Sequence, residues 1–550
     1  MPSPWFDRAA ALRRLGHDDF DVLVVGGGIT GAGVALDAAS RGLRTALVER
    51  EDFASGTSSR SSKLVHGGLR YLDQREVRLV GEALAERQRL IENAPHLVSI
   101  LPFLLPMFDG DRRLTRRVAP MVDVALWSYD LVGGLRIGRR HRRITVDDAL
   151  ERFPTLDRAR LRAAFVYFDA RADDARLTLA VARTAARHGA AVANHAQVTG
   201  FVKHGPRVVG ATVEADGAEL TVRARVVVNA TGIWADDVRA LDEGAHPASM
   251  RPAKGVHLTL PRALVRNHIA AVLPTSDDRR SVFVVPWGEH TYVGTTDTPY
   301  DGALDEPRCT DDDLRYLLAA LDDVMTVDVR PRDVVATWAG VRPLLRGPTR
   351  ARTADLSRRH SVRTSTSGVV TVTGGKLTTY RRMAADAVDA AIRQLPGAVP
   401  PSRTKALRLA GSEGIRTPTA RLDASDRRPL TRAEHLRSRY GADAGAVERI
   451  AGSTPTWGDA LVPGLPYLRA EAVYAVREEM GRSLDDVLSR RTRARVLDHD
   501  ATAVAAPAVA ALLAAELGWS DADVAAELTA FAALLAADDP RPVAEPPVSA

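Results

Sequence analysis

The first strong hydrophobic pattern in the chain predicts a strand, a tight turn and a helix. Residues 21–25, DVLVV, form a short β-branched run of the kind found in buried parallel strands. The string GGGITGAG follows at once, and residues 32–39 continue with a helical composition. A further apolar run at 45–48 predicts the next strand. This order is typical of a βαβ unit with a parallel sheet.

The glycine string predicts the chemistry of that turn. Gly26, Gly28 and Gly31 satisfy GxGxxG, which permits the tight turn, close approach of backbone to a pyrophosphate, and close packing of helix on strand. The N–H groups at the helix start favour a diphosphate. Glu49 ends the second strand near the ~20-residue offset expected for an acid that binds a ribose hydroxyl, which disfavours an NADP phosphate. The pattern predicts dinucleotide binding, with FAD and NAD both open.

Three later segments favour FAD. Residues 54–72, ASGTSSRSSKLVHGGLRYL, combine hydroxyls, glycines and cations directly after the second strand. Residues 226–236 form a buried-type strand that ends in a small-residue turn, and residues 369–384 form another strand, a glycine pair and a helix start. A simple NAD domain is one contiguous stretch, whereas these segments lie far apart in the chain and suit a longer flavin.

The rest of the chain predicts further regions. Short β-rich pieces such as VFVVP and TYVGTTDT, bounded by Pro and Gly, indicate a mixed sheet over the cofactor. Residues 396–429 lack periodicity and predict a linker, and residues 430–535 show helical patterning. Residues 538–550 carry several prolines and little to bury, so we expect a disordered tail.

Composition adds several exclusions. The chain has 550 residues with 45% hydrophobic and 26% charged residues, as in folded soluble proteins of more than one domain. Its single cysteine, Cys309, excludes an intrachain disulfide and a cysteine-clustered metal site, and we expect no metal. The net charge of +6 mildly favours acidic partners. We expect no signal peptide and no membrane span, and therefore a cytoplasmic protein.

Four strings of the sequence resemble one enzyme family. SSKLVHGGLRYL, GTTDT at 294–298, GVRPL at 340–344 and GGKLTTYR at 374–381 are similar to the FAD-dependent glycerol-3-phosphate dehydrogenases, the quinone-linked enzymes and their oxidase relatives. The resemblance runs from about residue 21 to residue 500. It implies an α/β fold: a glutathione-reductase-like FAD-binding Rossmann domain interleaved with a mixed β-sheet substrate cap, plus an all-α C-terminal domain. We expect the FAD and cap region at 18–395, with the cap at roughly 85–160 and 240–365.

The resemblance also implies the substrate contacts. Oxidation of glycerol 3-phosphate to dihydroxyacetone phosphate needs cations for the phosphate, and forked guanidinium groups suit it best. The positions implied are Arg70, Tyr71, Arg342, Arg358 and Lys376. Arg358 lies in an arginine-rich segment, where Arg352 and Arg359 are alternatives.

The cofactor contacts are assigned along the motifs. We expect a helix start beside the flavin, where it stabilises the charge that develops on reduction. The predicted cofactor residues are Gly26, Gly27, Gly28, Ile29, Thr30, Gly31, Glu49, Arg50, Ser58, Ser59, Ser61, Ser62, Lys63, Leu64, His66, Val198, Ala230, Thr231, Gly232, Gly375, Lys376, Leu377 and Thr378.

For the catalytic base the sequence leaves two candidates. His257 in KGVHL and His66 in LVHGG both carry an imidazole that accepts a proton near neutral pH, and Arg342 completes the predicted catalytic set. His66 is alternatively a flavin contact. Either histidine can instead be structural.

The resemblance implies a membrane quinone, menaquinone or ubiquinone, as the electron acceptor, or O2 in the oxidase branch. Two basic clusters, RIGRRHRR at 136–143 and RRTRAR at 490–495, are candidates for contact with an anionic membrane surface on the inner face of the cell membrane, or else for solvated loops and domain docking. A homodimer stays open. The competing interpretations are an amino-acid-oxidase-like flavoenzyme and a non-catalytic or nucleic-acid-linked flavoprotein. Aromatic residues, at 5%, are too few to favour nucleic acid.

Overall fold

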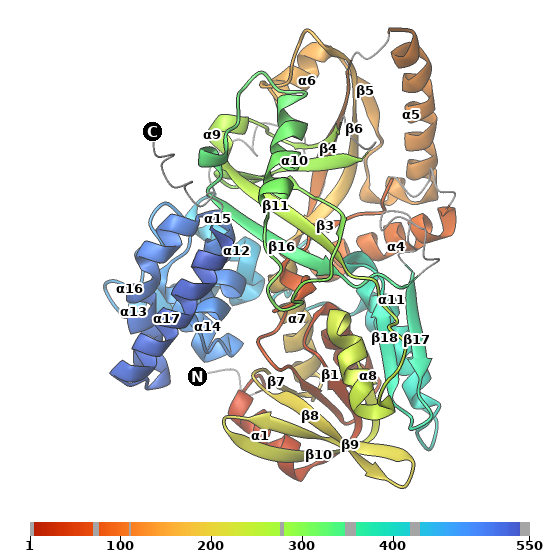
Figure 1. Cartoon of the computed structure of the whole chain (residues 1–550), viewed down its shortest axis with the longest axis vertical. Helices are drawn as coiled ribbons and strands as arrows, with labels where there is room; N and C mark the ends of the chain where they lie inside the picture. Colours follow the sequence, from red (N-terminus) through yellow and green to blue (C-terminus); the bar gives the residue numbers. More distant parts are fainter. Residues whose placement is uncertain are drawn as a thin grey trace, which may run out of the picture.

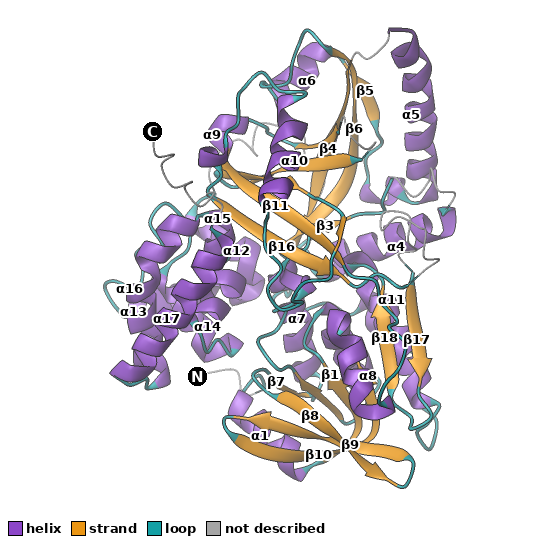
Figure 2. Cartoon of the chain, in the orientation of Figure 1, coloured by secondary structure: helices purple, strands orange, loops and turns teal. Residues whose placement is uncertain are grey.

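The computed structural model describes residues 5–69, 76–108, 112–275, 280–346, 359–417 and 430–539. Figure 1 shows two β-sheet regions, one above the other, with a bundle of helices against their side. Figure 2 shows that this bundle contains no strand among its described residues, whereas the other two regions combine strands and helices. The predicted fold class is therefore confirmed.

The lower region is an eight-stranded sheet built around β1. The order along its main path is β17-β18-β10-β1-β2-β7, and β8 and β9 extend it from β10. The central pairs of β1 with β2 and β10 are parallel, and β1 is almost wholly buried, as expected for a sheet covered on both faces. Its strands are β1 (Asp19–Val25), β2 (Thr45–Val48), β7 (Ala191–Ala193), β8 (Gln197–His204), β9 (Arg207–Ala215), β10 (Ala218–Asn229), β17 (His360–Thr364) and β18 (Val370–Gly374).

Helix α2, which follows the glycine string, lies between two other helices at this sheet. It contacts α7 on one side and α11 on the other. Because α11 comes from far downstream, the nucleotide-binding region closes with distant parts of the chain. The helices of this region are α1 (Arg8–His17), α2 (Ile29–Ser40), α7 (Asp174–Arg187), α8 (Ala235–Glu243) and α11 (Tyr380–Ile392).

The upper region is a ten-stranded mixed sheet, the cap. Its main path is β15-β11-β14-β13-β12-β4-β6-β3, with β16 paired to β11 and β5 to β6. The strands are β3 (Leu64–Val65), β4 (Val98–Phe108), β5 (Arg142–Ile144), β6 (Leu161–Ala172), β11 (Ala253–Pro261), β12 (Ala270–Pro274), β13 (Ser281–Trp287), β14 (His290–Gly294), β15 (Thr298–Pro299) and β16 (Ala336–Arg342). The cap helices are α4 (Val77–Asn93), α5 (Arg112–Val132), α6 (Val146–Arg152), α9 (Arg262–Val265) and α10 (Asp311–Asp322).

The cap differs from its predicted range at three strands. Strands β3 and β6 belong to the cap sheet although they lie outside 85–160 and 240–365, and β17 at the end of that range belongs to the lower sheet. The predicted linker also differs, because its first part packs on α2 of the lower region and on the end of α4 in the cap. Leu409 donates its backbone N–H to the Asn93 carbonyl at 2.8 Å, and Ser402 and Thr404 bond to Asp37. Residues 418–429, and 540–550 of the predicted tail, lie outside the described residues.

The C-terminal region is helical. It comprises α12 (Arg432–Tyr440), α13 (Ala444–Ser453), α14 (Arg469–Glu479), α15 (Ala494–Leu497), α16 (His499–Leu517) and α17 (Asp521–Asp538), with a π-helical turn at Asp486–Arg491. By length and mean hydropathy, α16 is the one helix among the described ranges that could cross a bilayer. It packs on α14 and α17, and Val509, Ala510 and Leu513 on it are fully buried. One face of α16 therefore forms part of the core of this helical region.

The RRTRAR cluster lies at the interface where the helical bundle docks, so the domain-docking alternative is confirmed for it and the membrane alternative is wrong. Arg490, Arg491, Arg493 and Arg495 are all buried between the helical bundle and the other regions. Asp52, from the loop after β2, accepts hydrogen bonds from Arg490 at 2.7 Å and from Arg491 at 2.6 and 2.8 Å. The first three arginines each meet a buried carboxylate, and Arg495 pairs with the partly exposed Asp485 and Asp538. A run of cations in the sequence does not reveal these tertiary pairings.

Replacing Asp52 by asparagine should destabilise the docking of the helical bundle. Two buried guanidinium groups would lose their shared carboxylate, and breaking a buried ion pair typically costs about 3–5 kcal/mol of unfolding free energy. Denaturant unfolding and limited proteolysis of the bundle measure the effect. The matched control is Asp147→Asn, which removes an exposed ion pair with Arg158 and should cost at most about 1 kcal/mol. Equal losses in the two variants would contradict this account.

Candidate active site

A cavity of about 960 Å³ lies between the two sheets. The strand ends of the lower sheet and the loops that follow them form one wall, and the cap strands form the other. This volume is at the upper end of the range for cofactor and ligand pockets. Most of the predicted cofactor residues line it.

The first part of the wall is the glycine turn before α2. Gly26, Gly28, Ile29 and Thr30 line the cavity, and the start of α2 therefore faces it. A side chain at Gly31 would collide with the Gly26 carbonyl oxygen, so only glycine lets the helix come this close to the turn. Gly27 and Gly31 shape the turn without lining the cavity.

Glu49 supports the turn and also lines the cavity. Its carboxylate accepts the Gly27 N–H at 2.5 Å and the Glu51 N–H at 3.0 Å. Burial raises the pKa of this carboxyl group. Arg50 lines the cavity beside it and lies 4.5 Å from the centroid of the Trp234 ring.

The serine segment, residues 58–63, has two sides. Ser58, Ser61 and Ser62 line the cavity, and the Ser58 hydroxyl accepts the Ile29 N–H at 2.9 Å. Ser59 and Lys63, predicted to wrap the cofactor with them, do not line it. The Lys63 ammonium is instead buried against Asp174 at 3.3 Å, because a carboxylate in the core compensates its charge better than an apolar wall could.

Two further pieces complete the lower wall. Ala230, Thr231 and Gly232 follow β10 and line the cavity, as does Val198 at the start of β8. Leu64 lines it from the cap side.

The glycine pair after β18 directs a helix start at the cavity. Gly375 has a φ of +83°, and a side chain there would collide with Met383. Gly375, Lys376, Leu377 and Thr378 line the cavity where the 3-10 turn Leu377–Thr379 leads into α11. The N–H groups at such a helix start favour negative charge on a bound ligand.

His257 occupies the centre of the cap wall on β11. Its Nε2 lies 2.9 Å from the Ser62 hydroxyl, and its ring stacks on Trp338 at 4.6 Å with an interplanar angle of 6°. Its Nδ1 is buried and has no hydrogen-bond partner among the described residues. Burial, together with the charges of Lys63 and Arg342, lowers the pKa of His257 well below 6.5. The imidazole is therefore neutral and able to accept a proton at neutral pH.

Arg342 ends β16 and points its guanidinium into the cavity wall. It donates to the Thr295 hydroxyl and the Thr296 carbonyl at 3.0 Å, and to Asp297 at 3.3 Å. These contacts fix the plane of the guanidinium. Lys376 lines the same cavity.

The remaining predicted site residues differ in where the structure places them. His66 lines the cavity, its backbone N–H donates to the Thr378 hydroxyl at 3.3 Å, and its ring contacts Phe283 edge to face. Arg70, Tyr71, Arg352 and Arg358 lie outside the described residues. Arg359 is exposed and donates to Glu76 at 2.9 Å.

The structure adds residues that the sequence patterns did not indicate. Arg280 lines the cavity and donates to the Asp297 carbonyl at 2.8 Å, and Trp338 supports His257 from behind. An apolar part of the wall comes from β4, α5, β12, β13 and the loop after β3. It consists of Leu69, Leu105, Val122, Ala125, Val272 and Phe283. Trp338 stands four residues before Arg342 on one strand, but no pattern in the sequence pairs it with His257.

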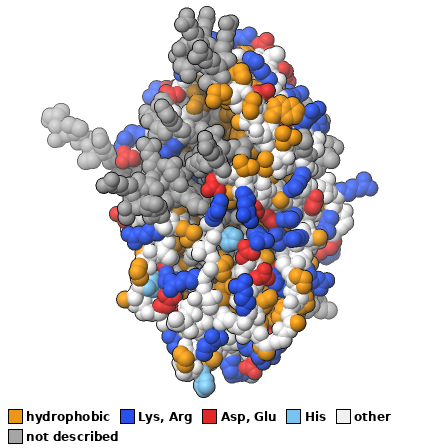
Figure 3. Space-filling model, turned by 90° about the vertical axis from the view of Figure 1, so that its right-hand side faces the viewer, with side chains coloured by type: hydrophobic (Ala, Val, Ile, Leu, Met, Phe, Trp, Pro, Cys, Tyr) orange, Lys and Arg blue, Asp and Glu red, His pale blue; other side chains and the backbone are white. Residues whose placement is uncertain are grey.

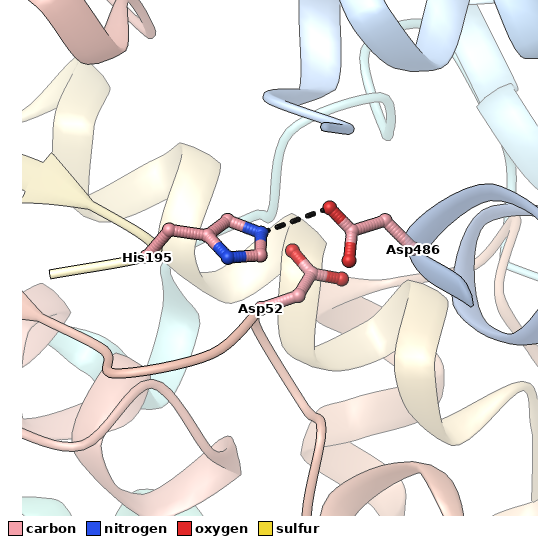
Figure 4. Close-up of side chains that lie close together, drawn as sticks. All are labelled: Asp52, His195 and Asp486. Atoms are coloured by element: carbon pink, nitrogen blue, oxygen red, sulfur yellow. Dashed lines mark hydrogen bonds and ion pairs between the residues drawn. The ribbon is translucent and has the colours of Figure 1, made fainter. Parts of the chain in front are cut away.

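A cluster outside the cavity has side chains of metal-ligand type. Asp52, His195 and Asp486 lie close together at the edge of the helical bundle (Figure 4). His195 Nε2 is 3.0 Å from Asp486, whose hydrogen bond and charge outweigh burial and raise the pKa of His195. Because the Asp52 oxygens already accept from Arg490, Arg491 and Asn194, we interpret the cluster as an ion-pair network.

The cavity residues fit FAD. One end offers the glycine turn, the helix start and Glu49 for a diphosphate and a ribose, as in other dinucleotide sites. The other end offers a second helix start at Gly375, which suits a ring system that becomes negatively charged. Between them the serine segment supplies hydroxyls along the wall.

Comparisons with known proteins agree with this fit. Residues 21–381 match the family described as FAD dependent oxidoreductase, and residues 402–524 match the C-terminal domain of alpha-glycerophosphate oxidase. Glycerol-3-phosphate dehydrogenase 2 of Mycobacterium tuberculosis is 41% identical over 537 residues, which cover 96% of this chain and 90% of the relative. The human mitochondrial glycerol-3-phosphate dehydrogenase is 40% identical over 526 residues, covering 92% and 71%.

A solved structure shows the same architecture. The glycerol-3-phosphate dehydrogenase from Bacillus halodurans, complexed with FAD, superposes with a TM-score of 0.78 at 29% identity, and the match covers 98% of this chain and 99% of that one. The chain therefore belongs to the glycerol-3-phosphate dehydrogenase family of FAD-dependent oxidoreductases, and its cofactor is FAD.

Proposed function

We propose that this protein oxidises sn-glycerol 3-phosphate to dihydroxyacetone phosphate and passes the electrons to a membrane quinone. The observation that supports this most directly is the meeting of Arg342, Lys376 and a neutral His257 in one cavity, beside the helix start at Gly375. A phosphate ester needs the cations, and an alcohol that loses hydride needs a base. When bound, FAD supplies the acceptor for the hydride that leaves C2.

The cations hold and orient the substrate. Arg342 has a guanidinium fixed by hydrogen bonds from both of its terminal nitrogens, which places a positive charge on the cavity wall for the phosphate. Lys376 adds a point charge, and Arg280 is a further cation on the same wall. Arg70, Tyr71 and Arg358 remain proposed contacts.

His257 takes the proton of the C2 hydroxyl. As hydride leaves C2 and the C–O bond becomes a carbonyl, the hydroxyl proton moves to the imidazole of His257. Its Nε2 lies 2.9 Å from the hydroxyl of the cavity-lining Ser62, and the Trp338 ring fixes the imidazole plane. His66 is the alternative base.

An anaerobic titration tests the reaction. Glycerol 3-phosphate should bleach the flavin absorption band of the holoenzyme, and a menaquinone analogue should restore it faster than O2 does. Faster recovery with O2 would favour the oxidase alternative. Bleaching by an amino acid but not by glycerol 3-phosphate would favour an amino-acid-oxidase-like enzyme, and bleaching by neither would favour a non-catalytic flavoprotein.

The pH dependence follows from the pKa of His257. A base must be unprotonated, and burial with the nearby Lys63 and Arg342 charges lowers this pKa well below 6.5. The acid limb of kcat/KM should therefore lie below pH 6.5, with activity retained from pH 6.5 to 7.5. Stopped-flow flavin reduction across this range measures it. An acid limb above pH 7 would contradict the assignment.

We further propose that one face of the cap binds an anionic membrane surface. Helix α5 exposes Met121, Val124, Trp127 and Leu131, of which Met121 is 70% and Leu131 74% accessible. Figure 3 faces this side of the molecule and shows hydrophobic side chains in its upper half and Lys and Arg side chains across its middle. The arginines of the 136–143 cluster are exposed next to α5, and Arg140 lies 5.7 Å from the centroid of the Trp127 ring. Exposed apolar and basic side chains together favour an anionic bilayer.

Charge reversal tests this face. Changing Arg139, Arg140, Arg142 and Arg143 to glutamate should reduce sedimentation with anionic liposomes at least tenfold, since each such cation contributes about 1 kcal/mol near anionic lipid. Flavin reduction by glycerol 3-phosphate should stay unchanged. The matched control reverses Arg223 and Arg225, exposed arginines of β10 at the far end of the molecule (Figure 1). Undiminished liposome binding by the first variant would reject the face.

A further inference from the structure

One arginine of the helical bundle reaches the wall of the active-site cavity from behind. Arg493 is only 1% exposed and has a φ of +89°, a conformation that residues other than glycine rarely adopt. Its Nη2 donates to the Ser59 carbonyl at 2.6 Å and to Asp174 at 3.0 Å, and its Nη1 donates to the Ser489 carbonyl at 2.8 Å. The bundle thus bonds directly to the backbone of the serine segment.

Asp174 ties the same arginine to the rest of the serine segment. This carboxylate stands at the start of α7 and is fully buried. It accepts the Ser61 N–H at 3.0 Å, the Ser61 hydroxyl at 2.7 Å and the Lys63 ammonium at 3.3 Å. Arg493 and Lys63 therefore share one carboxylate on the side of the segment that faces away from the cavity.

The cavity side of the serine segment carries the partners of His257. The Ser62 hydroxyl lies 2.9 Å from His257 Nε2, and the Ser61 carbonyl accepts the Trp338 indole N–H at 3.3 Å. Trp338 stacks on the His257 ring, and the Lys63 ammonium lies 4.7 Å from the centroid of that same indole. A shift of the serine segment would move the hydrogen-bond partner and the stacking partner of the imidazole together.

We infer that the helical bundle is part of the active-site scaffold, with Arg493 as a positioning residue that holds the serine segment, and through it His257, in place beside FAD. This inference deepens the proposed function and rests on it where substrate turnover is measured. The inference also implies that Arg493 strengthens FAD binding, because Ser58, Ser61 and Ser62 line the cavity wall that Arg493 supports.

The electrostatics of the segment agree with this role. Burial and the charge of Arg493 lower the pKa of Lys63 to about 8, against the opposing charges of Asp173 and Asp174. Lys63 in turn lowers the pKa of His257. The guanidinium therefore acts by charge on Lys63, the cation that itself acts on the imidazole.

The docking of the bundle does not depend on Arg493 alone. Arg490 and Arg491 bond to Asp52, and Arg176 of α7 pairs with Glu479 of the bundle at 2.6 Å. A variant at Arg493 should therefore keep the bundle docked, and the effect on the site can be separated from unfolding.

The test is a graded series of Arg493→Gln and Arg493→Lys in the full-length holoenzyme. Limited proteolysis should show a docked bundle in both variants. For Arg493→Gln we expect flavin reduction by glycerol 3-phosphate to slow by about ten- to a hundredfold, as for a small misplacement of a reacting group, with KM changed by at most about twofold. The dissociation constant of FAD, measured by reconstituting the apoprotein, should rise at least about fivefold. Arg493→Lys keeps the charge but loses the forked donor geometry. Its rate of flavin reduction and its FAD dissociation constant should lie between those of Arg493→Gln and the wild type.

The control is Arg477→Gln, which removes a surface ion pair with Glu516 in the same bundle. It should change neither the rate of flavin reduction nor the FAD dissociation constant. If both Arg493 variants reduce and retain FAD like the wild type, even with a lower Tm, Arg493 is structural only and the inference is overturned. Measuring the FAD dissociation constant requires no glycerol 3-phosphate. A wild type that glycerol 3-phosphate does not reduce would therefore refute the proposed function and still leave Arg493 open to test.

Discussion

Replacement of Arg342 by methionine should lower kcat/KM for glycerol 3-phosphate about a thousandfold while FAD stays bound. The phosphate loses its partner in a partly buried charge pair, which costs about 2–5 kcal/mol, and about 4 kcal/mol corresponds to a factor of a thousand. The guanidinium is held ready by Thr295, Thr296 and Asp297. Steady-state kinetics with a soluble acceptor measure the loss, and the flavin spectrum shows whether FAD remains.

Two further variants separate the effect of the guanidinium geometry from a general effect of losing an arginine. Arg342→Lys keeps the charge without the fork and should recover only part of the activity. Arg315→Met removes an exposed arginine of α10 that pairs with Asp312, and it should leave kcat/KM unchanged. A loss of less than about tenfold in Arg342→Met would move the main phosphate contact to another cation, such as Lys376 or Arg280.

Replacement of His257 by asparagine should slow flavin reduction by about a hundred- to ten-thousandfold, the usual contribution of a general base. Asparagine is uncharged and polar, so it can still bond to the Ser62 hydroxyl but cannot accept the substrate proton. FAD should stay bound, because the helix starts at Gly28 and Gly375 are untouched. Anaerobic stopped-flow reduction measures the rate.

The comparison variant is His66→Asn. The substitution keeps the backbone hydrogen bonds between His66 and Thr378 but removes the ring that contacts Phe283 at the cavity. We therefore expect a smaller effect on the rate of flavin reduction and a larger one on FAD retention. Unchanged reduction by His257→Asn would remove His257 as the base. If flavin reduction is slow in His66→Asn and unchanged in His257→Asn, His66 is the catalytic base.

Local patterns were sufficient where backbone conformation carries the chemistry. GxGxxG at 26–31 and the glycine pair at 374–375 demand turns that only glycine makes easily, and both lie at the cavity as their motifs suggest. The fold class was implied by the family resemblance, and the recurrence of strand, turn and helix at distant points of the chain agreed with it.

Local patterns did not predict whether a charged side chain lines the cavity or is buried against a distant carboxylate. Lys63 sits in a segment whose serines line the cavity, yet its ammonium turns to Asp174 because a buried cation needs a carboxylate. The arginines at 490–495 were indistinguishable by sequence from those at 136–143. One group is buried against Asp52 and Asp174, and the other is exposed beside α5.

The sequence by itself determined the family, the FAD-binding motifs and the types of residue offered to a phosphate ester, because these depend on short strings and their order. The tertiary structure decided which cations reach the cavity, which ring supports His257, and that the C-terminal bundle touches the serine segment through Arg493. The physical reason is that burial and charge pairing join residues more than 400 positions apart, as Ser59 and Arg493 are, and no local pattern of hydrophobic and polar residues encodes such a pair.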